Sequence, residues 1–139
     1  MFLRPIYLLN QLRKSMIVIV GGLLIAVLNV TSYADMPTGD VNAGAQIYNS
    51  VCKGCHGVSI APTLRGVIDR PIASVEDFAG YSDGLKAKHD LTWTKENLDT
   101  FLTNPAEFAP GTLMVQIIPE AQKRADIIAF LAALPPPRK

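Results

Sequence analysis

The sequence Cys52-Lys53-Gly54-Cys55-His56 contains the only two cysteines of this 139-residue chain, and a histidine follows the second one directly. Two thiols three positions apart lie on one side of a helical turn, so each can add to one vinyl group of the same porphyrin. The neutral imidazole of His56 can then donate a nitrogen lone pair to iron. The pattern predicts covalent attachment of haem through Cys52 and Cys55, with His56 as the first axial ligand.

The same spacing has other uses. A Cys-x-x-Cys pair also occurs as a redox-active dithiol, as a short disulfide and as half of a zinc site. A closed zinc site needs four ligands, and beyond the motif the chain has one further histidine, His89. Haem attachment is favoured, and a disulfide or a thiol oxidoreductase is the main alternative.

Residues 1–34 have the composition of an export signal. A basic leader precedes an uncharged apolar run over residues 16–28, and an A-x-A-like sequence ends at Ala34. The run is shorter than the roughly 20 residues that span a bilayer, which favours a cleaved secretory signal over an uncleaved anchor. Export to the bacterial periplasm suits the cysteines, because free thiols are unsafe in an oxidising compartment unless they are consumed.

The remaining residues, 35–139, have the size of one domain. Three of the 13 basic residues and none of the 12 acidic residues lie before residue 35, so 10 basic side chains face 12 acidic ones and the formal charge is −2. This slightly acidic balance, with no basic stripe, makes nucleic acid an unexpected partner.

Helical patterns dominate this domain. Asp40 suits the N-cap of a first helix that runs to the haem motif, with an apolar face formed by Val41, Ala45, Tyr48 and Val51. Gly44 interrupts this helix at a cost of about 1 kcal/mol relative to alanine. Either another backbone or a ring crosses closely there, or the glycine is merely tolerated; periodicity leaves both open.

Three later helices are expected. Ser82 suits the N-cap of a helix over 83–88, and Thr94 that of a helix near 95–102 that ends at Asn104-Pro105. The last helix is expected to begin at Pro119, to end before residues 135–137, and to bury a face formed by Ile127, Ile128, Leu131 and Leu134. The apolar run 115–118 has no partner strand and is expected to line a pocket.

Together these residues resemble a class I cytochrome c, the small monohaem electron carriers of the mitochondrial cytochrome c and bacterial cytochrome c2 type. The resemblance covers nearly all of residues 35–139. It implies an all-α cytochrome c-like fold in which the N- and C-terminal helices cross, while shorter helices and loops wrap one covalently bound haem c. In this fold Gly44 lies at the helix crossing, and Tyr48 packs against Phe130.

The sequence Pro110-Gly111-Thr112-Leu113-Met114 resembles the family loop whose methionine sulfur is the second axial ligand of iron. The resemblance therefore implies Met114 as the sixth ligand. A His/Met pair raises the reduction potential relative to two histidines. Two protein ligands leave no open iron position for a substrate, so we expect an electron carrier and not an enzyme.

The resemblance assigns further residues around the haem. The carbonyl of Pro62 would accept the other ring N–H of His56 and orient the imidazole, and Leu64 would pack on the porphyrin. The haem propionates would be surrounded by Arg70, Tyr81, Trp93 and Thr112. Without haem, these four would be a surface charge, two core aromatics and a turn residue.

The chain also departs from the mitochondrial pattern. Leu85 and Phe101 occupy positions that commonly carry an asparagine and a tyrosine, so the pocket beside the methionine should be drier. Ala106, Glu107 and Leu113 occupy positions of lysines that ring the exposed haem edge. Because rim charges steer encounter, we expect a redox partner whose docking surface is not strongly acidic.

The sequence predicts a periplasmic monomer that exchanges single electrons with redox protein partners and is not stably inserted in a membrane if the signal is cleaved. A dedicated haem subunit of a periplasmic dehydrogenase is a close alternative. A haem-based catalyst or sensor with a displaceable Met114 ligand is an alternative from another class.

Overall fold

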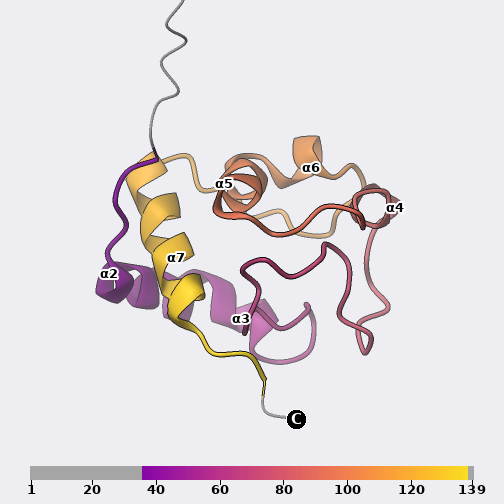
Figure 1. Ribbon diagram of the computed structural model, residues 1–139, viewed down its shortest axis with the longest axis horizontal. Coiled ribbons are helices and arrows are strands. Elements are labelled where there is room, and N and C mark those ends of the chain that lie inside the picture. The colour runs from indigo at the N-terminus through magenta and orange to yellow at the C-terminus, as the bar shows by residue number, and fades with distance from the viewer. Residues whose placement is uncertain (1–35, 138–139) are drawn as a thin grey trace, which may run out of the picture. The chain divides into compact units, whose positions relative to one another are not determined.

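The computed structural model describes residues 36–137, so the expected export signal at 1–34 lies outside the described residues. The fold is all-α, as predicted, and the part of the chain described here contains no strand, only an isolated bridge between Pro71 and Thr92. The elements in chain order are α2 (Val41–Ile47), the π-helical turn η1 (Tyr48–Cys52), α3 (Lys53–His56), α4 (Asp83–Lys86), α5 (Lys95–Thr103), α6 (Pro105–Phe108) and α7 (Ala121–Ala133) (Figure 1). Within 36–137, no helix has both the length and the apolar character needed to span a bilayer.

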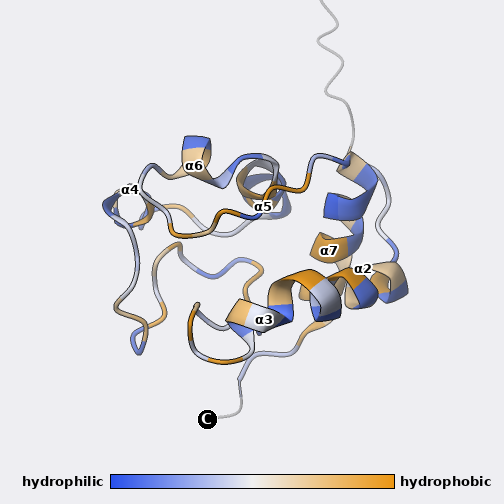
Figure 2. Ribbon diagram, turned by 180° about the vertical axis from the view of Figure 1, so that it is seen from behind, coloured by the Kyte–Doolittle hydropathy of each residue, from blue (hydrophilic) through white to orange (hydrophobic). Residues whose placement is uncertain are grey.

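Helices α2 and α7 lie across each other, in both views of the ribbon (Figures 1 and 2). Gly44 is at the crossing: a Cβ atom placed on it would collide with the Asp126 carbonyl oxygen and lie 2.8 Å from the Phe130 Cβ. The rings of Tyr48 and Phe130 pack with their centroids 5.1 Å apart. The crossing at Gly44 is therefore confirmed, and the glycine is there because only a residue without a side chain lets the backbones approach so closely.

The start of α2 is tied to the same crossing. The Asp40 carboxylate accepts hydrogen bonds from the Asn42 and Ala43 N–H groups, which confirms its predicted role as N-cap. The Asp40 N–H in turn donates to the Asp126 carboxylate at 2.8 Å. One carboxylate caps α2 and a second one joins that cap to α7.

The predicted apolar face of the first helix is wrong in part. Val41 and Val51 are exposed, whereas Ala45 and Tyr48 are half-buried and Gly44 is fully buried. The buried stripe is centred on Gly44 because α7 lies directly on that residue.

The predictions for the shorter helices hold with small shifts. Ser82 caps α4 and Thr94 caps α5, each through its side-chain oxygen, but α4 ends at Lys86, earlier than expected. The sequence did not predict α6, which starts at Pro105 directly after α5. The Asn104 side chain accepts from the Glu107 N–H, so the residue expected to end one helix also begins the next.

Helix α7 buries Ile127, Ile128 and Leu131, as predicted, and Leu134 is half-buried at its end. It starts at Ala121 with Glu120 as N-cap, so the expected start at Pro119 is wrong. The Pro119 carbonyl accepts a hydrogen bond from the Arg124 guanidinium instead of entering the helix ladder.

The run 115–118 is not a strand, as expected, but it does not line a pocket as a whole. Ile118 is buried, and its N–H donates to the Leu102 carbonyl at 2.9 Å. Val115 and Ile117 are exposed. The remaining core is formed mainly by residues of α4, α5 and α7 together with Val67, Ile72, Trp93 and Ala109.

Candidate functional site

The two cysteines lie at the end of η1 and within α3, on one continuous helical stretch. They form no disulfide with each other, and Cys52 is half-buried whereas Cys55 is exposed. Burial raises the pKa of the Cys52 thiol. The helical backbone places the two sulfurs on one side of a turn, the arrangement that attachment of a single porphyrin requires.

His56 follows at the last position of α3, and its ring is half-buried. Its Nδ1 lies 2.7 Å from the Pro62 carbonyl oxygen. A carbonyl only accepts, so Nδ1 carries the proton and the lone pair is on Nε2. Burial lowers the pKa of His56, with the bond to Pro62 opposing it, so the neutral ring that ligates metal is favoured. This donor set fits a haem iron held through Nε2.

Met114 lies in the long connection between α6 and α7. Its side chain is half-buried and packs against the hydrophobic core, as does that of Leu64. Gly111 has φ +79°, which the tight Pro-Gly-Thr turn requires, and the Met114 N–H donates to the Thr112 hydroxyl at 3.3 Å.

Side chains alternate along this connection. Thr112 and Met114 are partly buried, whereas Leu113 and Val115 are 82% and 88% exposed. Successive residues of extended chain point to opposite sides. The connection therefore turns one potential iron ligand inward and two apolar side chains outward.

Two of the four residues expected near the propionates, Arg70 and Trp93, are joined by a hydrogen bond, whereas the Tyr81 hydroxyl accepts from the Val75 N–H. The Trp93 N–H donates to the Arg70 carbonyl at 2.9 Å, and the Arg70 guanidinium donates to the Thr63 and Arg65 carbonyls. Burial lowers the pKa of Arg70, and Tyr81 opposes this. The recorded hydrogen bonds do not join Thr112 to this group; its hydroxyl serves the Met114 N–H instead.

Aromatic side chains surround Trp93. The ring centroids of Trp93 and Phe101 are 5.1 Å apart, and Phe108 stacks on Trp93 at 5.8 Å. Leu85 and Phe101 are both buried in this core. Buried apolar side chains therefore fill these two positions, and a drier pocket beside Met114 stays a prediction.

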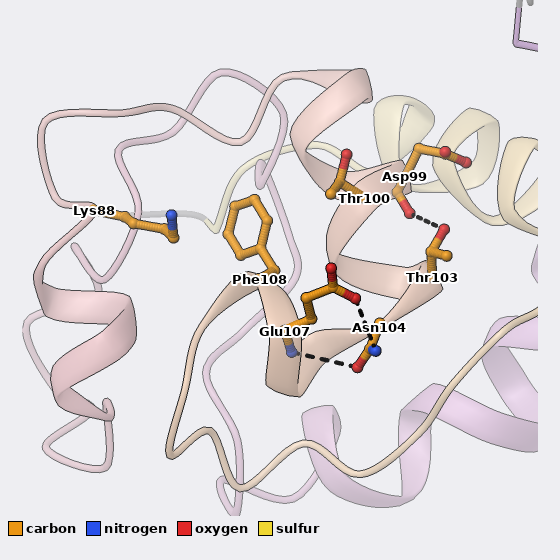
Figure 3. Close-up of a pocket in the computed structure, with 7 residues that line it drawn as sticks. All are labelled: Lys88, Asp99, Thr100, Thr103, Asn104, Glu107 and Phe108. Atoms are coloured by element: carbon orange, nitrogen blue, oxygen red, sulfur yellow. Dashed lines mark hydrogen bonds between the residues drawn. The ribbon is translucent and has the colours of Figure 1, made fainter.

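A surface hollow of about 490 Å³ lies beside α5 and α6 (Figure 3). It is lined by Lys88, Asp99, Thr100, Thr103, Asn104, Glu107 and Phe108. The Lys88 ammonium lies 4.8 Å from the centre of the Phe108 ring, a cation–π contact. No lining residue belongs to the set predicted for haem.

The zinc alternative gains no ligands from the fold. His89 is exposed, and its ring contacts the Asp90 carboxylate and the Lys86 carbonyl. Among residues 36–137 there is no group of three or more His, Cys, Asp and Glu side chains placed to share a metal ion.

The cytochrome c family model matches residues 41–135, which includes every site residue described above. The chain belongs to the cytochrome c family. It is 41% identical over 104 residues to the cytochrome c of Tetrahymena pyriformis, covering 71% of this chain and 93% of that protein. It is 44% identical over 103 residues to cytochrome c-type cyt cy of Rhodobacter capsulatus, covering 70% of this chain and 51% of the relative.

A solved structure leads to the same family. Cytochrome cH from Methylobacterium extorquens matches with a TM-score of 0.58 and 37% identity, over 68% of this chain and 99% of that one. The chain spans only about half the length of the Rhodobacter relative, but nearly the whole of the other two. As a member of this family, the protein is a monohaem electron carrier with one covalently attached haem c.

One buried polar cluster was missed at the sequence level. Arg124 is buried and pairs with Asp99, with 2.7 Å between Nε and Oδ1. The sequence contained one signal of this burial. Arg124 lies three and four residues before Ile127 and Ile128, on the same face of the predicted last helix. A charge on the buried stripe of a helix needs a partner inside the fold.

Proposed function

We propose that the protein is a periplasmic one-electron carrier whose haem is bound by Cys52 and Cys55 and whose iron is ligated by His56 and Met114. The observation that carries the assignment is the 2.7 Å contact between His56 Nδ1 and the Pro62 carbonyl. It fixes the tautomer and leaves Nε2 for the metal, the usual arrangement of a ligating histidine and its hydrogen-bonded partner.

When bound, the haem supplies an iron centre that accepts and releases one electron. His56 is held in its neutral, oriented form by the Pro62 carbonyl. Met114 offers a soft, neutral sulfur from the opposite segment, which favours ferrous iron. Leu85 and Phe101 belong to the buried core against which Met114 packs, and they are proposed to keep water away from that sulfur. Few groups then reorganise when the charge on iron changes, and this suits rapid electron exchange.

Arg70, Tyr81 and Trp93 are proposed to hold the propionates. The Arg70 guanidinium is half-buried and bound to two carbonyls, so its charge is fixed in place. A fixed cation stabilises carboxylates that are removed from water. Thr112 is proposed to contribute through its hydroxyl, next to the Met114 segment.

The redox partner is proposed to present a weakly charged surface. Residues 108–119 contain no charged side chain, and Leu113, Val115 and Ile117 are exposed within that stretch. We expect association rates that change less than about threefold between low and physiological ionic strength, because few rim charges steer the encounter. A steep fall in the rate with added salt would contradict this.

The same exposed side chains favour a second candidate function. A dedicated haem subunit of a dehydrogenase would bury Leu113, Val115 and Ile117 permanently against its enzyme. Purification of the native protein separates the two candidates: a carrier elutes alone as a monomer, whereas a subunit copurifies with its enzyme.

The axial assignment is tested with Met114→Ala. We expect haem to stay attached, the far-red absorption of methionine-ligated ferric haem to disappear, the potential to fall, and added imidazole or carbon monoxide to bind. Ligand binding equal to that of the wild type would remove Met114 from the site. Carbon monoxide binding by the reduced wild type without denaturant would instead favour a haem-based catalyst or sensor.

A further inference from the structure

Arg124 of α7 is a buried cation with three partners. Its Nε donates to Asp99 Oδ1 at 2.7 Å, and its Nη1 donates to the carbonyls of Ile118 at 2.9 Å and Pro119 at 2.8 Å. The Arg124 side chain is 10% exposed and that of Asp99 25%. A guanidinium leaves water at a high cost unless it is both paired and hydrogen-bonded, and here both conditions hold.

Two of these bonds end on the connection that leads from Met114 into α7. In the described part of the chain, residues 115–119 are joined to the rest of the fold by the bonds from Arg124, by the Ile118 N–H to the Leu102 carbonyl, and by the buried Ile118 side chain. Val115 and Ile117 are exposed and add little packing. The attachment point thus lies four residues from Met114.

Asp99 is the anchor of this cluster. It lies in α5, where its carbonyl accepts from the Thr103 hydroxyl at 2.8 Å. Figure 3 shows its carboxylate extending away from the hollow that the residue lines. The Asp99 side chain thus joins α5 to α7 through Arg124, while Arg124 joins both helices to the Met114 connection.

We propose that the Arg124–Asp99 pair is a positioning device that holds residues 115–119, and through them Met114, so that the sulfur competes effectively with external ligands for iron. This inference rests on the proposed axial role of Met114. A ligand held in place loses less freedom when it binds than one on a loose segment, so constraint of the segment strengthens the bond.

The test compares Arg124→Lys and Asp99→Asn with wild-type ferric holoprotein, by imidazole titration and far-red absorption. A lysine ammonium presents its N–H groups from a single atom and does not reproduce the separate Nε and Nη1 positions that meet Asp99 and the two carbonyls. Arg124→Lys should therefore bind imidazole about tenfold more tightly, the scale of a modest coupling between two positions. Its far-red absorption should weaken. Asp99→Asn should shift both readouts less, because an amide oxygen still accepts from Nε. If Arg124→Lys does not fold, Asp99→Asn alone still tests the proposal.

The control is Asp126→Ala, which removes another buried carboxylate contact of α7. Asp126 accepts from the Asp40 N–H at the start of α2 and from the Gln122 side chain, and its carboxylate has no recorded hydrogen bond to residues 115–119. We expect a lower urea midpoint with wild-type imidazole affinity. If imidazole affinity rose in proportion to the loss of stability in every variant, Asp126→Ala included, the proposal would be overturned. The assignment of Met114 as a ligand would then still stand. A wild-type protein without far-red absorption would overturn the proposal together with the ligand assignment.

Discussion

The helix crossing and the ligand-bearing connections of this cytochrome are built in different ways. At the crossing, Ile127 and Ile128 are 1% exposed, and Gly44 meets the α7 backbone directly. The segments that contain the expected haem ligands have no such packing: Val58, Ile60, Leu113 and Val115 are all exposed, and Figure 2 shows the loop after α3 as largely hydrophobic. The first region is packed by polypeptide, whereas the second leaves several apolar side chains exposed.

The largest effect is expected when the two cysteines that are expected to attach the haem are removed. The double variant Cys52→Ala, Cys55→Ala should lose all covalent haem, because no other thiol exists in the chain. Absorption and intact mass after expression with the maturation machinery report this. Exposed Lys53 lies between the cysteines, so Lys53→Ala is a matched control that should keep the haem. A coloured double variant with a covalent adduct would show that the attachment lies elsewhere.

A smaller effect is expected at the crossing itself. Gly44→Ala should lower the free energy of unfolding of the holoprotein by about 1–3 kcal/mol, because the new methyl group collides with the Asp126 carbonyl. Gly54→Ala is the control: it is also helical, but a Cβ at residue 54 meets no atom within 4 Å. That substitution should stabilise by up to about 1 kcal/mol through helix propensity. Equal urea midpoints for the two variants would argue against a close backbone approach at Gly44.

The smallest expected effect is on the free energy of unfolding at acid pH. The Asp40 N–H, followed by the Gln122 side chain, lowers the pKa of Asp126 in the folded protein. Its stabilisation should therefore be complete above the unfolded pKa of about 3.9 and be lost as the pH falls through the lower folded pKa. Asp126→Asn should remove this contribution.

The measurement is the free energy of unfolding of wild type and Asp126→Asn from neutral pH downward. The difference between the two curves should be constant at neutral pH and should shrink only in strong acid. A difference between wild type and Asp126→Asn that grows on acidification would have the wrong sign for a lowered pKa.

The sequence predicted well where chemistry or local backbone decides. Asp40, Ser82 and Thr94 act as N-caps because a short polar side chain can satisfy nearby N–H groups in any context. The contact between His56 and Pro62 that the resemblance implied is also present, and only five residues separate the two. The sequence prediction failed for Val41 and Val51, because their exposure depends on the angle at which α7 crosses α2.

The sequence alone determined the haem motif and the helical class, because these depend on covalent chemistry and periodicity. The helix crossing at Gly44 was implied by the resemblance to class I cytochromes c. Only the tertiary structure decided that Arg124 would be buried against Asp99 and the carbonyls of Ile118 and Pro119. A buried charge finds partners in three dimensions, and its partner in α5 lies 25 residues away along the chain. No local pattern specifies such a pairing.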